Sequence, residues 1–396
     1  MPVIRAAANP FWFARRFYGS ASSTRLASVS PNAASPAAKT TIGALSAAAV
    51  HADGPLRNDW TREEIQSIYD SPFMDLMYFG AKVHRENFNP REVQQCTLLS
   101  IKTGGCTEDC KYCPQSSRYQ TAVKAQKLLD SDEVLHAALR AKDAGSTRFC
   151  MGAAWRDLAG RKSNFSKILT YVKTIRGMGM EVCCTLGMLN ETQAKQLKEA
   201  GLTAYNHNLD TSREFYPKII STRSYDERLQ TISHAQDAGI SVCSGGIIGL
   251  GEAEEDRVGL LHTLSTLTQH PESVPVNALL AVQGTPLENQ EPVSVFEMVR
   301  MIATARIVMP KSMVRLSAGR VRFSMSEQAM CFMAGANSIF TGDKLLTTPN
   351  NEISDDKAMF DFLGLVPKPP NFEQGSDKAE QRVYQNCKKA VENAEA

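Results

Sequence analysis

The sequence predicts an α/β protein built around a parallel (β/α)8 barrel of the TIM type, with a helical extension before the barrel and a polar tail after it. Three observations lead to this prediction. Eight short β-rich runs occur along the chain, segments with helical periodicity separate them, and several of those segments end at a glycine typical of a helix C-cap. An open, doubly wound sheet is the alternative.

The first 50 residues differ in composition from the rest of the chain. They carry five basic residues and no acidic one, many Ala and Ser, and several Phe and Trp. This composition is typical of an organelle transit peptide and lacks the long apolar centre of a secretory signal. We therefore expect residues 1–50 to be a disordered, cleaved segment that directs the protein to the mitochondrial matrix. A merely disordered N-terminus is the alternative.

The remaining chain has the composition of a globular protein. The whole sequence is 43% hydrophobic and 22% charged, and its net charge of +2 conceals 39 basic and 42 acidic side chains after residue 50. This balance argues against a nucleic-acid partner. The apolar runs near Ile247 and Val276 are too short and too often interrupted by Gly or Pro to span a membrane. We therefore expect the protein to bind neither nucleic acid nor a membrane.

The elements follow in a regular order. A helical pattern over residues 62–88 forms the extension, the barrel domain covers residues 51–366, and residues 367–396 form the tail. The predicted strands are residues 96–102, 147–151, 181–186, 203–208, 240–244, 274–281, 313–317 and 337–341. The main predicted helices are residues 132–144, 165–176, 191–200, 225–238 and 293–307.

Three cysteines follow the first predicted strand in the run GGCTEDCKYCP, residues 104–114: Cys106, Cys110 and Cys113. On a glycine-flanked loop, three thiols at this spacing can bind three irons of a four-iron cluster and leave the fourth iron open to a small ligand. A zinc site normally needs a fourth protein ligand. Cysteines without a ligand role are the other alternative. An organelle matrix keeps thiols reduced, so the chain's ten cysteines favour metal chemistry over disulfides.

This motif resembles the signature of the radical S-adenosylmethionine (SAM) enzymes, in which an aromatic residue, here Tyr112, precedes the last cysteine. The resemblance implies that the three cysteines hold a catalytic [4Fe-4S] cluster whose open iron binds SAM. Reduction would then cleave SAM to methionine and a 5′-deoxyadenosyl radical. That radical can take hydrogen from a C–H bond that no acid or base side chain can attack.

A second group of cysteines falls on the second, third and fifth predicted strands: Cys150, Cys183 or Cys184, and Cys243. Taken alone, each is more typical of a small core residue. Three of them in one barrel can meet in the lumen. Neighbours in a strand face opposite sides, so only one of Cys183 and Cys184 can point inward.

Polar residues share a face on two other predicted strands. Asn206, Asn208 and Asp210 line up on the fourth strand, where they need each other, water or a ligand as partners. Arg315 and Ser317 line up on the seventh. By its chemistry alone, a buried Arg is more often a carboxylate partner than a metal ligand, because its guanidinium stays protonated.

The run GGIIGLGE, residues 245–252, closes the fifth strand, and its glycine spacing differs from that of a dinucleotide-binding loop. It resembles the strand of radical SAM barrels that lies behind the adenine of SAM. Over about residues 60–365, the chain resembles the biotin synthase family in its organelle-targeted eukaryotic form. The segments that carry this resemblance are residues 106–118, 145–155, 205–210, 242–252, 314–320 and 328–340.

The resemblance implies two ligand sets and a binding site. A [2Fe-2S] cluster would lie deeper in the barrel, with Arg315 serving geometry or cluster lability more than binding strength. Its ligands would be Cys150, Cys183, Cys243 and Arg315. The SAM contacts would be Tyr112 and Ile247 near the adenine and Asn208 and Asp210 at the ribose, and the dethiobiotin contacts would be Asn208 and Asn277.

The resemblance also implies a reaction and partners. The enzyme would be a sulfurtransferase for the last step of biotin biosynthesis, joining two saturated carbons of dethiobiotin through sulfur from the [2Fe-2S] cluster. Two SAM molecules would be consumed per biotin. The implied partners are a low-potential, ferredoxin-type electron donor, iron-sulfur assembly proteins that rebuild the cluster, and a second copy of the chain in a homodimer.

Three alternatives are weaker. Lipoyl synthase would show a further N-terminal cysteine triad, and here only Cys96 precedes Cys106. An iron-sulfur scaffold or sensor would need no SAM pocket. A zinc-binding RNA protein conflicts with the acidic balance of the chain after residue 50. Four cysteines remain without a predicted role: Cys96, Cys184, Cys331 and Cys387.

Overall fold

The computed structural model describes residues 45–371 and 377–395. Most of the expected transit segment, residues 1–50, therefore lies outside the described residues, and its proposed boundary falls within helix α1 (Ala47–Ala52). Residues 1–44 and the chain from Leu45 onward are separate units. The second unit contains all the elements described below, and none of its described helices is long and apolar enough to cross a membrane.

The predicted barrel is confirmed. Parallel strands form one continuous ladder, and β1 (Glu92–Lys102) pairs with both β2 (Arg148–Ala153) and β9 (Ser338–Thr341), so the sheet closes. The intervening strands are β3 (Glu181–Thr185), β4 (Ala204–Asn206), β5 (Ser241–Cys243), β6 (Gly246–Ile248), β7 (Ser273–Ala278) and β8 (Met313–Leu316). Both β5 and β6 pair with β7 and share one of the eight barrel positions.

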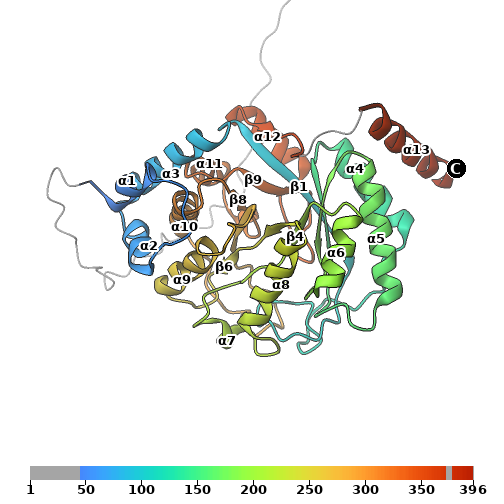
Figure 1. Cartoon of the computed structure of the whole chain (residues 1–396), viewed down its shortest axis with the longest axis horizontal. Helices are drawn as coiled ribbons and strands as arrows, with labels where there is room; N and C mark the ends of the chain where they lie inside the picture. Colours follow the sequence, from blue (N-terminus) through green and yellow to red (C-terminus); the bar gives the residue numbers. More distant parts are fainter. Residues whose placement is uncertain (1–44, 372–376, 396) are drawn as a thin grey trace, which may run out of the picture. The chain divides into compact units, whose positions relative to one another are not determined.

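Helices lie outside the strands, as Figure 1 shows. Several begin with a capping box in which the N-cap side chain and the residue three positions later exchange hydrogen bonds, for example Ser224 with Glu227 at α8. The helices around the barrel are α4 (Ser131–Asp143), α5 (Lys162–Gly177), α6 (Glu191–Glu199), α7 (Tyr216–Ile219), α8 (Tyr225–Asp237), α9 (Glu254–Ser265), α10 (Val295–Val308), η1 (Arg320–Arg322), α11 (Met325–Met333) and α12 (Ile353–Leu363).

The helical extension differs from the prediction in one detail. The pattern over residues 62–88 forms two helices, α2 (Arg62–Tyr69) and α3 (Phe73–Asn87), because Pro72 has no N–H to donate and disfavours helical backbone at Ser71. Helix α3 packs against α10. After the barrel come a short strand, β10 (Val366–Pro367), and a helix within the polar tail, α13 (Asp377–Glu395).

The fifth predicted strand, residues 240–244, ends at Cys243, and a further strand, β6, follows a close backbone approach at Gly245. A Cβ added at Gly245 would lie 2.0 Å from the carbonyl oxygen of Pro275, so no larger residue fits there. The predicted fourth strand likewise ends early, at Asn206, before the chain turns at Asp210. Asp210 is the one non-glycine residue with positive φ in the described chain, at 69°.

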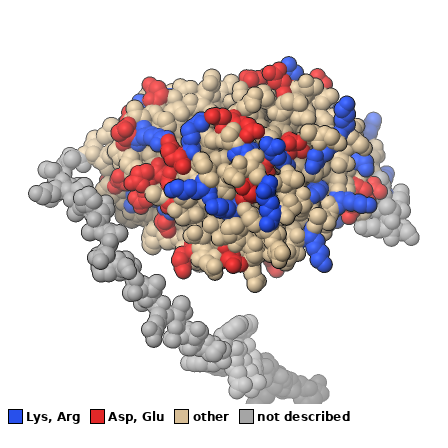
Figure 2. All heavy atoms as spheres, turned by 90° about the horizontal axis from the view of Figure 1, so that it is seen from below, with Lys and Arg blue, Asp and Glu red and all other residues tan. Residues whose placement is uncertain are grey.

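Two apolar regions result from this closure. The large core fills the space between barrel and helices, while a small cluster inside the barrel contains Cys96, Cys150 and Cys183. Acidic and basic side chains are interspersed on the face shown in Figure 2. The chemistry suggested by the sequence therefore has to be sought in the lumen and in the loops at its mouth.

Candidate active site

A cavity of about 330 Å³ lies at the carboxyl ends of the barrel strands, where active sites of this fold are found. Its wall brings together most of the residues singled out in the sequence. They come from the loops after β1 and β4 and from strands β2, β3, β6, β7 and β8: Cys106, Cys110, Tyr112, Cys113, Cys150, Cys183, Asn208, Asp210, Ile247, Asn277 and Arg315. Cys243 does not line this cavity; it lies behind Asn206 and Arg315, in contact with both.

The cysteine loop, residues 103–117, carries the first three thiols. It leaves β1 through Gly104 and Gly105, both at φ 68°, a left-handed conformation that favours glycine. The amide of Cys106 donates to the carbonyl of Gln115 at 2.9 Å, and the amide of Cys113 donates to that of Cys110 at 2.9 Å. These bonds fold the loop back on itself, so that all three thiols line the cavity.

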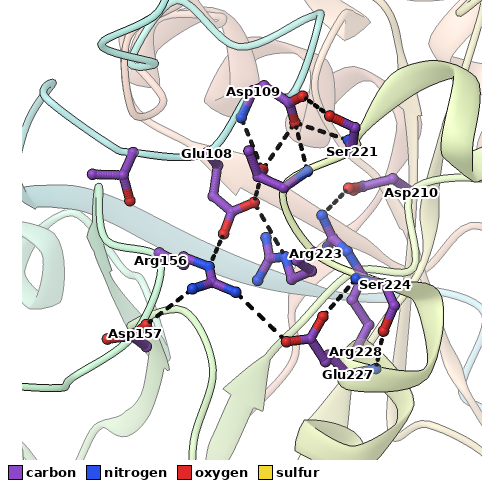
Figure 3. Close-up of polar contacts among 12 residues, drawn as sticks. Glu108, Asp109, Arg156, Asp157, Asp210, Ser221, Arg223, Ser224, Glu227 and Arg228 are labelled. Carbon is purple, nitrogen blue, oxygen red and sulfur yellow. Dashed lines mark hydrogen bonds and ion pairs between the residues drawn. The ribbon is translucent and has the colours of Figure 1, made fainter.

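Two acidic side chains between the first two cysteines fix this loop to the rest of the barrel (Figure 3). The Asp109 carboxylate accepts from the amides of Ser221 and Thr222 at 2.9 and 3.1 Å. The Glu108 carboxylate accepts from Arg156 Nε at 3.1 Å. The loop is thus held by segments that follow β2 and precede α8.

The wall opposite the loop is polar and buried. The Asp210 carboxylate, 2% exposed, accepts from the Tyr112 hydroxyl at 2.9 Å and forms an ion pair with Arg228 at 2.7 Å. Arg228 also donates to the Tyr216 hydroxyl at 2.8 Å. One carboxylate therefore links the cysteine loop, through its aromatic residue, to helix α8.

Three amide side chains continue this wall toward the lumen. Asn208 Oδ1 accepts from the amide of Gly245 at 3.3 Å, and Asn206 Nδ2 donates to Cys243 Sγ at 3.3 Å. Asn277 is held at both ends, because its Nδ2 donates to the carbonyl of Gly246 at 2.8 Å and its Oδ1 accepts from the amide of Ala318 at 3.2 Å. Fixed amides of this kind can match the donors and acceptors of a small polar ligand.

Deeper in the barrel lie four buried thiols, the lumen thiols: Cys96, Cys150, Cys183 and Cys243. Cys150 and Cys183 are register partners on neighbouring strands and both line the cavity. Cys184 points the other way, into the core between barrel and helices, as strand alternation predicts. Cys331 on α11 and Cys387 on α13 are remote from this group; both pack against that outer core.

Arg315 lies among the lumen thiols with every nitrogen engaged. Its Nε donates to Ser338 Oγ at 2.9 Å, its Nη1 to Cys243 Sγ at 3.5 Å, and its Nη2 to Gln94 Oε1 at 3.2 Å and to Cys96 Sγ at 3.4 Å. The ring of Phe340 lies 4.7 Å from the guanidinium carbon. The side chain is therefore held in one orientation, facing sulfur.

A buried ion network lies next to the lumen thiols. Arg148, on the same inward face as Cys150, pairs with Glu181 of β3 and with Glu272, to which it donates two hydrogen bonds at 2.8 and 3.0 Å. Burial alone would raise the pKa of Glu272, but the neighbouring Arg148 outweighs it and holds that pKa below its ordinary value of 4.5. Charge next to the lumen thiols is thus compensated within the fold.

Burial also acts on the thiols of the cysteine loop. It raises the pKa of Cys113 to about 11 and raises those of Cys106 and Cys110 above the ordinary value. Thiolates are the form that binds iron, so metal binding at this loop releases protons. No three His, Cys, Asp or Glu side chains in the described chain have the geometry of a single-ion site. All ten cysteines are free thiols.

Two residues of the cavity wall, Arg223 and Arg228, and one buried thiol of the lumen, Cys96, escaped the sequence reasoning. The two arginines lie before and within α8, more than a hundred residues from the cysteine loop, and no motif links them to it. Arg223 lines the cavity, and its buried Nε and Nη1 have no hydrogen-bond partner in the described chain. Cys96 could have been found from its strand, where it shares a face with Gln94 and Leu98.

Comparison with known proteins identifies the family of the chain. Residues 100–264 match the Radical SAM superfamily, and residues 275–366 match the Biotin and Thiamin Synthesis associated domain. Among solved structures, methylornithine synthase superposes with a TM-score of 0.68 at 19% identity, covering 82% of this chain and 97% of that protein. At this identity the likeness concerns the fold alone.

Curated relatives are much closer in sequence. The mitochondrial biotin synthase of Arabidopsis thaliana is 70% identical over 88% of this chain and 92% of its own length. The biotin synthase of Cytophaga hutchinsonii is 66% identical over 79% of this chain and 93% of its own. Emericella nidulans has a mitochondrial biotin synthase that is 59% identical, covering 81% of each chain. The chain belongs to the biotin synthase family of radical SAM enzymes.

Proposed function

We propose that two groups of side chains divide the biotin synthase reaction between them. Cys106, Cys110 and Cys113 of the cysteine loop hold the [4Fe-4S] cluster, and the lumen site holds the [2Fe-2S] cluster. The lumen site comprises Cys150, Cys183, Cys243 and Arg315. The observation that carries this proposal is that thiols of both groups line one cavity, at its mouth and in its depth.

The reaction is that of the family, the radical SAM insertion of sulfur that converts dethiobiotin to biotin, and it requires an electron donor. When bound, the first cluster supplies the electron that cleaves SAM, and the second supplies the sulfur atom. The donor sets fit these groups, because thiolates are the preferred ligands of iron-sulfur clusters and a three-cysteine loop leaves one iron free for SAM.

The polar wall binds SAM. Asp210 is an acceptor for the ribose hydroxyls, and Tyr112 and Arg228 hold its carboxylate in place. Asn208 lies beside it, and Ile247 provides an apolar contact for the adenine. Arg223 lines the cavity and forms an ion pair with Glu108 at 3.7 Å, and its buried Nη1, which has no hydrogen-bond partner in the described chain, offers its charge to the carboxylate of SAM. Two carboxylates, Glu108 and Asp109, keep the cysteine loop beside this wall.

Dethiobiotin lies between the two groups. The amides of Asn208 and Asn277 match the N–H and C=O groups of its ring, and the fixed orientation of Asn277 sets the position of that ring in advance. The reacting carbons would then lie between the cysteine loop and the lumen site, which both line the cavity.

The setting follows from the family and from the composition of the N-terminus. Two of the relatives are mitochondrial forms, and residues 1–50 have the composition of a transit peptide, which supports a location in the mitochondrial matrix. The resemblance to the family supports a homodimer, and consumption of the [2Fe-2S] cluster supports repair by iron-sulfur assembly proteins. Light scattering of the purified chain tests the dimer.

The assignment is tested with the anaerobically reconstituted protein, SAM, a strong reductant and dethiobiotin. We expect 5′-deoxyadenosine and biotin to rise together, close to two molecules of deoxyadenosine per biotin, and only when dethiobiotin is present. Mass spectrometry quantifies both products. Cleavage of SAM without biotin, despite an intact [2Fe-2S] cluster, would refute the assignment of the lumen site as the sulfur source.

A further inference from the structure

Cys96 is a buried thiol in the middle of the site for which the proposed ligand sets have no use. It lies on β1, is 0% exposed, and belongs to the small lumen cluster that also contains Cys150 and Cys183. Because Cys96 shares the inward face of β1 with Gln94 and Leu98, its sulfur cannot reach the outer core without a change of strand register.

The contacts of Cys96 place it beside the arginine of the lumen site. Arg315 Nη2 lies 3.4 Å from Cys96 Sγ, while Nη1 of the same guanidinium lies 3.5 Å from Cys243 Sγ. Cys150 packs in the same lumen cluster as Cys96 and is the register partner of Cys183 on the next strand. Four thiols and one guanidinium therefore surround the same part of the lumen, and Cys96 is one of the two thiols that the arginine contacts, the other being the proposed ligand Cys243.

The side chains of Arg315 and Cys96 differ in their strength as iron ligands. A guanidinium keeps its proton over the whole physiological range and is a weak metal ligand, whereas a cysteine thiolate is the ordinary ligand of an iron-sulfur cluster. The stronger ligand, Cys96, thus lies within hydrogen-bond distance of the weaker one, Arg315.

We propose that Cys96 is an alternative fourth ligand of the [2Fe-2S] cluster, able to replace Arg315 so that four cysteines hold it; this rests on the proposed function of the lumen site. In the exchange the Cys96 thiol gives up its proton as its sulfur binds iron, and the arginine takes up a proton as its nitrogen leaves. No electron is transferred. The lumen site therefore has two ligand states, one with arginine and one with cysteine.

The test compares three variants of the full chain after anaerobic reconstitution: Arg315→Ala, Cys96→Ser, and the double variant. Iron and sulfide content, absorption and Mössbauer spectra are measured, with circular dichroism to confirm folding. We expect Arg315→Ala to retain the [2Fe-2S] cluster with the spectrum of all-cysteine ligation, and the double variant to lose most of it. Arg315→Lys serves as a second single variant that keeps the buried positive charge should the alanine variant fail to fold.

A matched control combines Arg315→Ala with Cys331→Ser. Cys331 is equally buried, at 0% exposure, but lies on α11 outside the barrel, so this variant retains the cluster. Equal cluster content and identical spectra for Arg315→Ala with and without Cys96 would overturn the proposal. Cys183→Ser separates this result from a failure of the ligand set, because a [2Fe-2S] cluster that survives loss of Cys183 contradicts the lumen site itself.

Discussion

The cysteine loop and the lumen thiols present the same ligand atom in opposite settings. The loop lies outside regular structure, keeps Cys106 and Cys113 partly exposed, and depends on side-chain bonds from Glu108 and Asp109 for its position. The lumen thiols lie on strands of a closed sheet, and each is at most 4% exposed. One group is held by polar contacts between distant loops, the other by the backbone ladder of the barrel.

This difference corresponds to the two tasks of the enzyme. A cluster that must accept an electron and bind SAM needs an open iron at the mouth of the cavity. A cluster that gives up sulfur to a radical needs a site that excludes water and keeps its shape as atoms leave. Under the proposed assignment, the closed barrel supplies rigidity where sulfur is transferred, and polar contacts between loops hold the thiols where the cofactor enters.

Removal of one thiol from the cysteine loop should have the largest effect on activity, and it tests whether the loop and the lumen thiols have separate roles. We expect Cys110→Ala to abolish both 5′-deoxyadenosine and biotin formation, because the cleavage of SAM depends on the cluster at the loop. The measurement is mass spectrometry of both products after anaerobic reconstitution. Substantial SAM cleavage in this variant would disprove the role of the loop.

The neighbouring cysteines of β3 test the lumen side. Cys183→Ser removes a thiol that lines the cavity, so we expect biotin to disappear while SAM cleavage persists. Cys184→Ser is the matched control, since its thiol lies in the outer core, and it retains both products. Equal loss of biotin in the two variants would contradict the orientation of the strand as the deciding factor.

The rate of iron removal by a chelator measures how exposed each of the two thiol groups is. An anaerobic iron chelator should remove iron from the cysteine loop roughly tenfold or more faster than from the lumen site, because the latter needs the packed strands to open. Stopped-flow absorption at the wavelengths of each cluster follows the two phases. A single phase that removes both clusters together would show that the regions are not independent.

The ion network beside the lumen thiols makes a smaller contribution, which depends on pH. Arg148 lowers the pKa of Glu272 below 4.5, so the pair stabilises the fold above pH 4.5, and this stability is lost as the pH falls through the lower folded value. We expect Glu272→Gln to lower the free energy of unfolding by about 2 kcal/mol at neutral pH.

Denaturant unfolding of the apo-protein at several pH values measures this effect. The difference between wild type and Glu272→Gln should shrink as the pH falls below 4.5, since the wild-type carboxylate then takes up a proton as well. If the difference in unfolding free energy between wild type and Glu272→Gln stays constant below pH 4.5, the effect comes from packing and not from the charge of Glu272.

The smallest effect concerns the attachment of the cysteine loop. Asp109→Asn keeps the shape of the side chain and an oxygen that accepts from the amides of Ser221 and Thr222, but it removes the charge and the second oxygen, which accepts from the Ser221 hydroxyl. The cost should be about 1 kcal/mol, because these bonds are partly solvated. Chelation should become faster at the loop and stay unchanged at the lumen site. An equal acceleration at both sites would show that the variant loosens the whole barrel.

Much of this architecture was predictable from local pattern. The eight strands, the loop after the first strand and the rule that only one of Cys183 and Cys184 points inward follow from periodicity and spacing, which depend on neighbouring residues, whereas the choice of Cys183 came from the family resemblance. The bond from Tyr112 to Asp210 and the ties of Asp109 to residues 221 and 222 join segments about a hundred residues apart. Such contacts arise from barrel closure, which no local pattern records.

Two local details were not predicted. Asp210 adopts φ of 69°, a conformation that side chains other than glycine rarely take, and β4 ends at Asn206, although Asn208 and Asp210 still line the cavity. The extension contains two helices where one was expected, although Pro72 gave the signal for the break.

The central claim is that two independent thiol groups hold two different clusters. Mössbauer spectroscopy of protein reconstituted with isotopically enriched iron tests it most directly, with wild type, Cys110→Ala and Cys183→Ser measured side by side. We predict both cluster signals in wild type, loss of only the [4Fe-4S] signal in Cys110→Ala, and loss of only the [2Fe-2S] signal in Cys183→Ser. Loss of both signals, or of neither, in either variant would contradict the account.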